Sequence, residues 1–300
     1  LMGRNLHRAA INACALLDLD PVWIDPARDA GDWFLGRYQA QGIQKALERD
    51  SSIRAVYLTT PDYFGVMSDL RAIGAVCRKK GIPLLVDNAH GAHLKFLPQR
   101  YGQTHPVDCG AAICCDSLHK TMPAMTGGAL LHICEEAYID QAKQTMSLFG
   151  STSPSYPILL SCERALLYGE SGEAEQGFDW AAKQLDALRR LALEKKLALP
   201  LGAGDPAKLS LGFGAAGISQ EAFEAHLRAN QVEPEYTSGT ACVLMATGFN
   251  RQEDFQRIGR ALETLPEGLQ SQLEPFSLPH PQKALSIRQA VFAPQESLPV

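Results

Sequence analysis

Short apolar runs alternate with helical patterns over the first two hundred residues of this 300-residue chain, and this alternation constrains the fold more than any other feature. Strands that alternate with helices favour a parallel sheet covered by helices. Between the second and third expected strands, residues 66–81 have helical spacing, basic residues in the last turn and a glycine stop, which predicts a βαβ unit. The expected strands are residues 22–25, 55–59, 83–87, 111–115 and 128–133.

The pattern changes after a predicted long amphipathic helix at about residues 174–197. The Gly/Pro-rich stretch "LALPLGAGDPA" is typical of a linker, and beyond it the expected strands "KLSLGF" and "ACVLMA" alternate with helix patterns. Asn250 and Glu253 have the spacing of a capping box at the start of the last of these helices. We therefore predict two domains, a large α/β domain over residues 1–197 and a smaller α+β domain over residues 198–300.

Composition excludes several classes of partner. The net charge of −5 is dispersed, which argues against nucleic acid, and the apolar runs are too short to span a membrane. Eight cysteines without a C-x-x-C pair predict buried thiols in a reducing compartment, and the start lacks an export signal, so the cytoplasm is expected. The abrupt ends, at Leu1 and Val300, suggest a fragment truncated at both ends.

Two expected strands end in polar residues that could carry chemistry. The stretch "IPLLVDNAHGAH" delivers Asp87 and His90, and "AAICCDSLHK" delivers Ser117, His119 and Lys120. Ligands of open α/β sheets bind outside the carboxyl ends of the strands. Two such strand ends in one sheet predict a functional site there.

Two chemistries fit these residues poorly. Asp87-x-x-His90-x-x-His93 contains possible metal ligands, but Gly91 argues against a helix that would align them, so we expect no metal. Nucleotide hydrolysis requires a glycine-rich phosphate loop, and the stretch before Lys120 contains no glycine.

Pyridoxal phosphate fits the residues better. Its aldehyde needs a lysine amine, its pyridine nitrogen needs a carboxylate, and its phosphate needs hydroxyl and backbone donors. Lys120, Asp87 and Ser117 match these needs in that order. Burial of Lys120 against an apolar strand would favour loss of its proton, and the Gly127-Gly128 pair leaves room for a close turn beside the ring.

Five stretches in this order resemble the Orn/Lys/Arg decarboxylase family, a fold type I group of pyridoxal phosphate enzymes. They are "RNLHRA", "TTPDYFGVMSDL", "VDNAHGAHLKFLP", "SLHKTMPAMTGGALLH" and "STSPSY". The fourth is similar to the H-K-T-x-P-A-x-T-G-G-A motif of the family's shorter branch, and "QVEPEYTSGTACVLMATG" and "ALSIRQAVFAP" resemble its C-terminal region. The resemblance implies an aspartate aminotransferase-like large domain with a mostly parallel sheet and a smaller C-terminal domain.

The resemblance also implies roles for single residues. Lys120 matches the Schiff-base lysine, His119 the histidine before it, and Ser117 a phosphate-binding hydroxyl. Asp87 matches the partner of the pyridine nitrogen, and His90 a residue near the cofactor oxygen.

Further implied features lie nearer the ends of the chain. His7 matches a histidine that stacks on the ring, and residues 152–156 resemble a segment near the phosphate of a neighbouring subunit, which implies a homodimer. Two departures stand out. Ala9 replaces a serine of the family pattern. The family also has a phosphate-binding turn upstream of the stacking histidine, whereas this sequence begins only six residues before His7. We therefore expect this chain to be a piece of a longer protein.

The implied reaction is α-decarboxylation of arginine, lysine or ornithine to an amine and carbon dioxide. Lys120 or His119 would return the proton to the α-carbon. Glu233 and Glu235 are candidates for binding the distal cation of the substrate.

Two alternatives remain open. One is another pyridoxal phosphate reaction, an aldolase or an aminotransferase with Arg228 or Arg251 as the carboxylate clamp. The other is an inactive fragment that lacks the phosphate turn.

Overall fold

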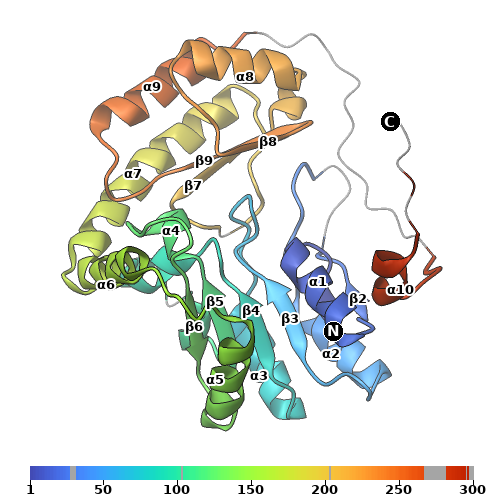
Figure 1. Ribbon diagram of the computed structural model, residues 1–300. Helices are drawn as coiled ribbons and strands as arrows, with labels where there is room; N and C mark the ends of the chain where they lie inside the picture. The colour runs from blue at the N-terminus through green and yellow to red at the C-terminus, as the bar shows by residue number, and fades with distance from the viewer. Residues whose placement is uncertain (28–31, 103, 203, 267–281, 295, 297–300) are drawn as a thin grey trace.

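The larger of two sheets has six strands in the order β2-β1-β3-β4-β5-β6 (Figure 1). The computed structural model describes residues 1–27, 32–102, 104–202, 204–266, 282–294 and 296. The strands of this sheet are β1 (Met2–Gly3), β2 (Trp23–Ile24), β3 (Val56–Thr59), β4 (Leu84–Asp87), β5 (Ile113–Asp116) and β6 (Leu130–Ile133). The helices are α1 (Arg8–Leu17), α2 (Ala40–Arg49), α3 (Leu70–Lys80), α4 (Leu118–Thr121), α5 (Ile139–Phe149), α6 (Tyr156–Glu170), α7 (Glu173–Glu194), α8 (Gln220–Ala229), α9 (Gln252–Glu263) and α10 (Ile287–Phe292).

The sheet is parallel from β2 to β5, and only β6 runs antiparallel. The five strands expected from the apolar runs are all present, and the βαβ unit of β3, α3 and β4 is confirmed. The α3 helix begins at Leu70 rather than at residue 66, because Asp69 caps it by accepting a hydrogen bond from the Ala72 N–H. Strand β1 was not predicted, because its two residues are too few to show an alternating hydrophobic pattern.

One face of the large sheet is covered by α2 and α3. Ile43 and Leu47 of α2, with Ile73 of α3, pack against Leu58 and Val86 from the centre of the sheet. Because side chains alternate along a strand, residues next to Val56 and Leu58 point to the opposite face. Tyr57 and Thr59 therefore point away from this core.

The second sheet has the order β7-β9-β8, with β7 (Lys208–Leu211), β8 (Tyr236–Ser238) and β9 (Ala241–Met245). The strands at 208–211 and 241–245 were expected, whereas β8 was not. Helices α7, α8 and α9 cover its outer face, and Leu185, Phe213 and Phe223 fill the core between them. The capping residue of α9 differs from the expected one: the Arg251 N–H donates to Asp254 Oδ2, one position beyond the predicted pair.

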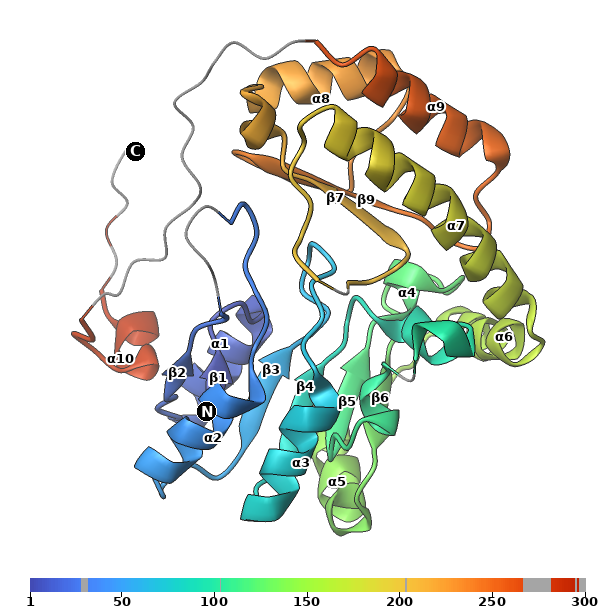
Figure 2. The ribbon, with the colours of Figure 1, turned by 180° about the vertical axis from the view of Figure 1, so that it is seen from behind.

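The second sheet lies over the carboxyl ends of the parallel strands, as both views show (Figure 2). Helix α7, which we expected in the first domain, packs its buried face on the core of the second sheet. The predicted division at residues 197 and 198 stays a prediction, and residues 267–281 and 297–300 of the second domain lie outside the described residues. Helix α10 instead lies against α1, where Arg288 donates to the carbonyls of Ala15 and Leu16.

Two further observations bear on the expectations from composition. Among the described residues, no helix combines the length and apolar composition that crossing a bilayer requires. All eight cysteines lie in the described ranges and are unpaired. Six are buried as expected, but Cys115 is half-buried and Cys134 is exposed.

Candidate active site

A cavity of about 670 Å³ opens at the carboxyl ends of β3, β4 and β5. Five of the predicted site residues line it: Asp87, His90, Ser117, Lys120 and His7. The four that end or follow β4 and β5 meet because these strands are parallel neighbours, with Asp87 directly opposite Cys115, whereas His7 comes from the start of α1. The chain beyond each strand end therefore reaches the same side of the sheet.

Asp87 is the buried carboxylate of the cavity, with 6% of its surface exposed. Its Oδ1 atom accepts a hydrogen bond from the Ala89 N–H at 3.1 Å. Within the described ranges of the chain, its Oδ2 atom has a single, long contact of 3.4 Å from the Tyr57 hydroxyl. Burial, together with the nearby Asp87 charge, raises the pKa of Tyr57, so this phenol keeps its proton. Asp87 therefore retains accepting capacity in the cavity.

Lys120 and His90 form the second part of the site. The Lys120 Nζ atom lies 3.1 Å from His90 Nε2. Burial lowers the pKa of His90 to about 3, and the positive charges of Lys208 and Lys120 add to this effect. A neutral imidazole can accept the lysine hydrogen bond through Nε2, which assigns its proton to Nδ1. That Nδ1 atom is buried and has no hydrogen-bond partner among the described residues.

Two aromatic side chains complete the walls of the cavity. The Tyr63 ring packs on His90 with 4.5 Å between ring centroids. Tyr63 lies in the family-resembling stretch "TTPDYFGVMSDL", but it was not predicted as a site residue. His7 lies at the exposed rim, where its Nδ1 atom accepts a hydrogen bond from the Ala9 N–H and caps α1. His7 is therefore held by the start of a helix that faces the strand ends.

Other predicted residues lie outside the lining of the cavity. The His119 Nδ1 atom bonds to the Gly128 carbonyl at 3.0 Å, so its expected proton-transfer role has no geometric support. The Gly127-Gly128 turn, expected beside the ring, instead approaches α6, because a Cβ on Gly128 would meet Cys162 Sγ at 2.8 Å. Gly127 has a φ of +96°, which accounts for the glycine at that position.

The two candidate glutamates have different surroundings. Glu233 is exposed and forms an ion pair with Arg228 at 2.9 Å. Glu235 accepts a hydrogen bond of 3.0 Å from the hydroxyl of Tyr63, which lines the cavity. Arg228 is held by Glu233 and Glu224 at the surface, which does not support its use as a carboxylate clamp.

The three members of the Asp87-x-x-His90-x-x-His93 motif do not converge. His90 contacts Lys120, whereas His93 Nε2 lies 2.8 Å from Asp205 Oδ1 in a pair that is almost fully buried. Burial alone would raise the pKa of Asp205, but His93 and then Lys208 outweigh it and hold the pKa below its usual value. This motif therefore divides between the cavity and the contact with the second sheet.

A buried network behind the strand ends was not predicted. Asp116 Oδ2 contacts Nε2 of His105 at 3.0 Å and Nε2 of His132 at 2.8 Å, and its Oδ1 accepts from Asn88 at 2.6 Å. Burial opposes ionisation of Asp116, but the two histidines hold its pKa well below the usual range. The three groups also have the spacing of metal ligands. Because Asn88 follows Asp87 directly, the network ties the ends of β4 and β5 together.

The fold and the cavity define the class of this protein: an α/β protein with the fold type I architecture of pyridoxal phosphate enzymes. The model of the Orn/Lys/Arg decarboxylase major domain matches residues 1–193, and the chain belongs to this family. It is 33% identical over 222 residues to the uncharacterised protein YaaO of Bacillus subtilis strain 168, covering 70% of this chain and 45% of that protein. It is 26% identical over 319 residues to an arginine decarboxylase of Halalkalibacterium halodurans, covering 100% of this chain and 64% of that protein. The chain thus spans about half to two thirds of the length of these relatives.

Solved structures show the same fold. A lysine decarboxylase of Francisella novicida has a TM-score of 0.71 at 17% identity, covering 87% of this chain and 44% of the other. An alanine–glyoxylate aminotransferase of Nostoc has a TM-score of 0.66 at 18% identity, covering 87% and 74%. The expected fold class and family are both confirmed.

The family uses pyridoxal phosphate, and the residues of the cavity fit it. Asp87 has accepting capacity for a protonated ring nitrogen, and the Lys120 amine lies on another wall of the same cavity. The buried His90 Nδ1 without a partner matches an acceptor that a bound molecule would supply. Asp87, Lys120, His90, His7 and Ser117 would hold the cofactor.

Proposed function

We propose that this protein decarboxylates a basic amino acid, arginine, lysine or ornithine, to the corresponding amine and carbon dioxide. The observation that carries the proposal is the convergence of Asp87, His90 and Lys120 on one cavity at the strand ends. Two of these side chains come from β4 or just beyond it, and the third follows β5, so only the fold unites them. Membership of the decarboxylase family supports the reaction type.

The cofactor, when bound, supplies an electron-accepting ring that stabilises the charge left when carbon dioxide departs. Asp87 holds the ring nitrogen protonated, because a buried carboxylate favours a positive partner. The Lys120 amine is the attachment point for the cofactor aldehyde. His90, kept neutral by burial and by two nearby lysines, accepts a hydrogen bond from Lys120 Nζ through Nε2. Lys120, oriented in this way, would hold the proton that returns to the substrate α-carbon.

We propose that Glu235, rather than Glu233, recognises the distal cation of the substrate. Its carboxylate is held by Tyr63, whose ring lines the cavity. Glu233 is already neutralised by Arg228. A carboxylate at the mouth of the cavity would select amino acids with a positively charged side chain.

We also propose that the protein acts as a homodimer with its sites near the subunit contact. Support comes from apolar side chains that α5 and α6 leave exposed on either side of residues 152–156. The unpaired cysteines support a reducing compartment such as the cytoplasm.

The test combines chemical tagging with a product assay. Borohydride reduction of the cofactor-loaded protein, followed by peptide mapping, is expected to place the cofactor on Lys120, and incubation with a basic amino acid is expected to release carbon dioxide. Lys120→Ala should abolish both signals, whereas Lys79→Ala, at an exposed position in α3, should leave both unchanged.

Three other outcomes would each contradict a different part of the proposal. A tag on another lysine overturns the assignment of Lys120. Formation of an oxo acid in place of carbon dioxide indicates an aminotransferase. Absence of any absorbance change on adding pyridoxal phosphate indicates the inactive alternative.

A further inference from the structure

Thr59 occupies the strand end next to Asp87 and begins the stretch "TTPDYFGVMSDL", but no role was predicted for it from the sequence. It is the last residue of β3 and lies directly opposite Asp87 in the register of β3 and β4. Its neighbours Val56 and Leu58 are buried in the core beneath α2 and α3, so Thr59 points to the opposite face together with Tyr57. Thr59 and Tyr57 both line the cavity.

The hydroxyl of Thr59 is buried without a partner. The residue is 9% exposed, and Oγ1 has no hydrogen-bond partner among the described residues. The hydroxyl of the next residue, Thr60, by contrast accepts a hydrogen bond of 3.0 Å from the Ser68 N–H. Buried hydroxyls are nearly always paired, because an unpaired one loses its bonds to water without replacement. A buried, unpaired hydroxyl in the wall of a cavity therefore indicates a polar group that binds there.

The chemistry of the cofactor identifies that group. Pyridoxal phosphate has four polar functions: a ring nitrogen, an aldehyde, a phosphate and a phenolic oxygen. Asp87 suits the nitrogen, Lys120 the aldehyde and Ser117 the phosphate, which leaves the phenolic oxygen for the donors that remain. Asn5 and Arg8 also line the cavity. The Thr59 hydroxyl and His90 Nδ1, however, are buried and have no partner among the described residues, which makes these two the candidates for the phenolic oxygen.

We propose that Thr59 is a cofactor-binding residue whose hydroxyl donates a hydrogen bond to the phenolic oxygen of pyridoxal phosphate. The proposal rests on the assignment of the cofactor to this cavity. Thr59 binds the oxygen from the sheet, and His90 binds it from the chain beyond β4. The cofactor is thus held at its ring edge by two neighbouring strands, β3 and β4, as well as by Lys120.

The test uses Thr59→Val, which keeps the size and branching of the side chain and removes only the hydroxyl. The dissociation constant for pyridoxal phosphate is expected to rise roughly tenfold, because the substitution removes one hydrogen bond to a charged group. It is measured by absorbance titration of the cofactor-free protein. Thr59→Ser should bind within about twofold of the wild type, because it keeps the donor.

Thr121→Val is the matched control. Thr121 also has a buried hydroxyl without a partner, but it does not line the cavity. Its replacement is expected to leave cofactor affinity unchanged. The cofactor-free Thr59→Val protein should melt at the wild-type temperature or above, because the hydroxyl has no bond to lose in that state. If Thr59 had a purely structural role, the cofactor-free Thr59→Val protein would melt below the wild-type temperature.

Two results would overturn the proposal alone: wild-type affinity in Thr59→Val, or equal losses in Thr59→Val and Thr121→Val. A wild-type protein that binds no pyridoxal phosphate would overturn the cofactor assignment and the Thr59 proposal together. If Thr59→Val does not fold, Thr59→Ser and Thr59→Ala make the same comparison, because they differ only in the hydroxyl.

Discussion

Glu233 and Glu235 stand two positions apart in the sequence, yet their carboxylates have different partners. The first pairs with Arg228 at the surface, and the second accepts the hydroxyl of Tyr63 at the cavity. Burial, followed by the hydrogen bond to Glu235, raises the pKa of Tyr63 to about 12, so the phenol remains a donor over the physiological range. The difference between the two glutamates makes them a matched pair for testing substrate recognition.

Glu235→Gln is expected to raise KM for the basic amino acid roughly tenfold, because a charged hydrogen bond contributes about 1.5–3 kcal/mol. The turnover number should change less, since the distal group does not take part in bond breaking. Glu233→Gln should leave both constants near the wild type. Steady-state measurement of carbon dioxide release checks this, and equal effects of the two substitutions would contradict the role of Glu235.

At the scale of elements, α6 is apolar on more than one face. Cys162, Ala165 and Gly169 pack into the core beside α7 and the chain beyond β4. The other side exposes large apolar residues, and the end of α5 adds to this surface. A helix that is apolar all round needs cover on both sides. The exposed residues are Met146, Leu148, Phe149, Tyr156, Leu159, Leu160 and Leu167.

Leu160→Glu is therefore expected to convert a dimer into a monomer, because a charge cannot be buried cheaply in an apolar contact. Leu193→Glu is the control, since Leu193 is similarly exposed but lies on α7. Sedimentation velocity distinguishes the two states. The prediction fails if the wild type sediments as a monomer, or if Leu160→Glu remains dimeric.

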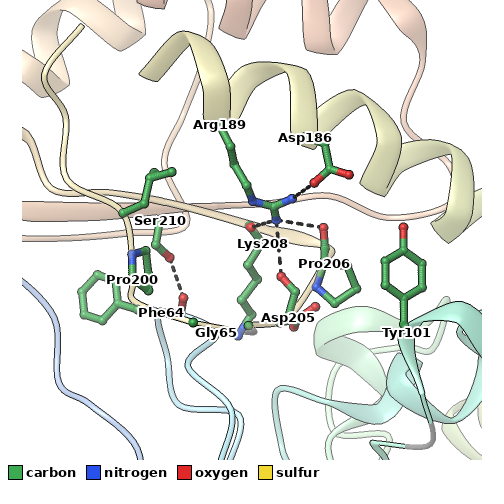
Figure 3. Close-up of a pocket in the computed structure, with 13 residues that line it drawn as sticks. Phe64, Gly65, Tyr101, Asp186, Arg189, Pro200, Asp205, Pro206, Lys208 and Ser210 are labelled. Atoms are coloured by element: carbon green, nitrogen blue, oxygen red, sulfur yellow. Dashed lines mark hydrogen bonds and ion pairs between the residues drawn. The ribbon is translucent and has the colours of Figure 1, made fainter. Parts of the chain in front are cut away.

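At the scale of the whole molecule, the two sheets are joined by buried polar contacts from the chain around β7. Ser210 Oγ donates to the Phe64 carbonyl at 2.6 Å, and Lys208 Nζ contacts the carbonyls of Asp62 and Tyr63 at 3.3 Å. Figure 3 shows Ser210, Phe64 and Lys208 around a pocket of about 360 Å³, where Arg189 of α7 donates to the carbonyls of Pro206 and Lys208. The loop that carries Tyr63 into the cavity is thus positioned by the second sheet.

Asp205→Ala is expected to reduce the free energy of unfolding by about 3–5 kcal/mol, because it leaves buried His93 without its partner. It also removes the acceptor of the Ala207 N–H. Asp186→Ala breaks an exposed pair with Arg189 and should cost about 0–1 kcal/mol. Urea unfolding of both variants provides the measurement. Losses of similar size would show that the buried pair does not stabilise the contact between the sheets.

Much of the site could be predicted because its chemistry lies at strand ends. Asp87 and Lys120 each follow an apolar run, and a parallel sheet brings such ends together. The same rule applied to residues 55–59 would have pointed to Thr59, so that signal was present in the sequence. Tyr63 had no such signal, because it lies in a loop whose position depends on Lys208 and Ser210.

The sequence by itself determined most of the strands, the βαβ unit of β3, α3 and β4, and the residues that end β4 and β5. These features depend on neighbours along the chain, and periodicity records them directly. Only the tertiary structure decided that α7 packs on the second sheet, that Glu235 rather than Glu233 contacts Tyr63 of the cavity wall, and that the Thr59 hydroxyl has no partner among the described residues. Such contacts join residues far apart in the chain, and they depend on how the two sheets pack against each other.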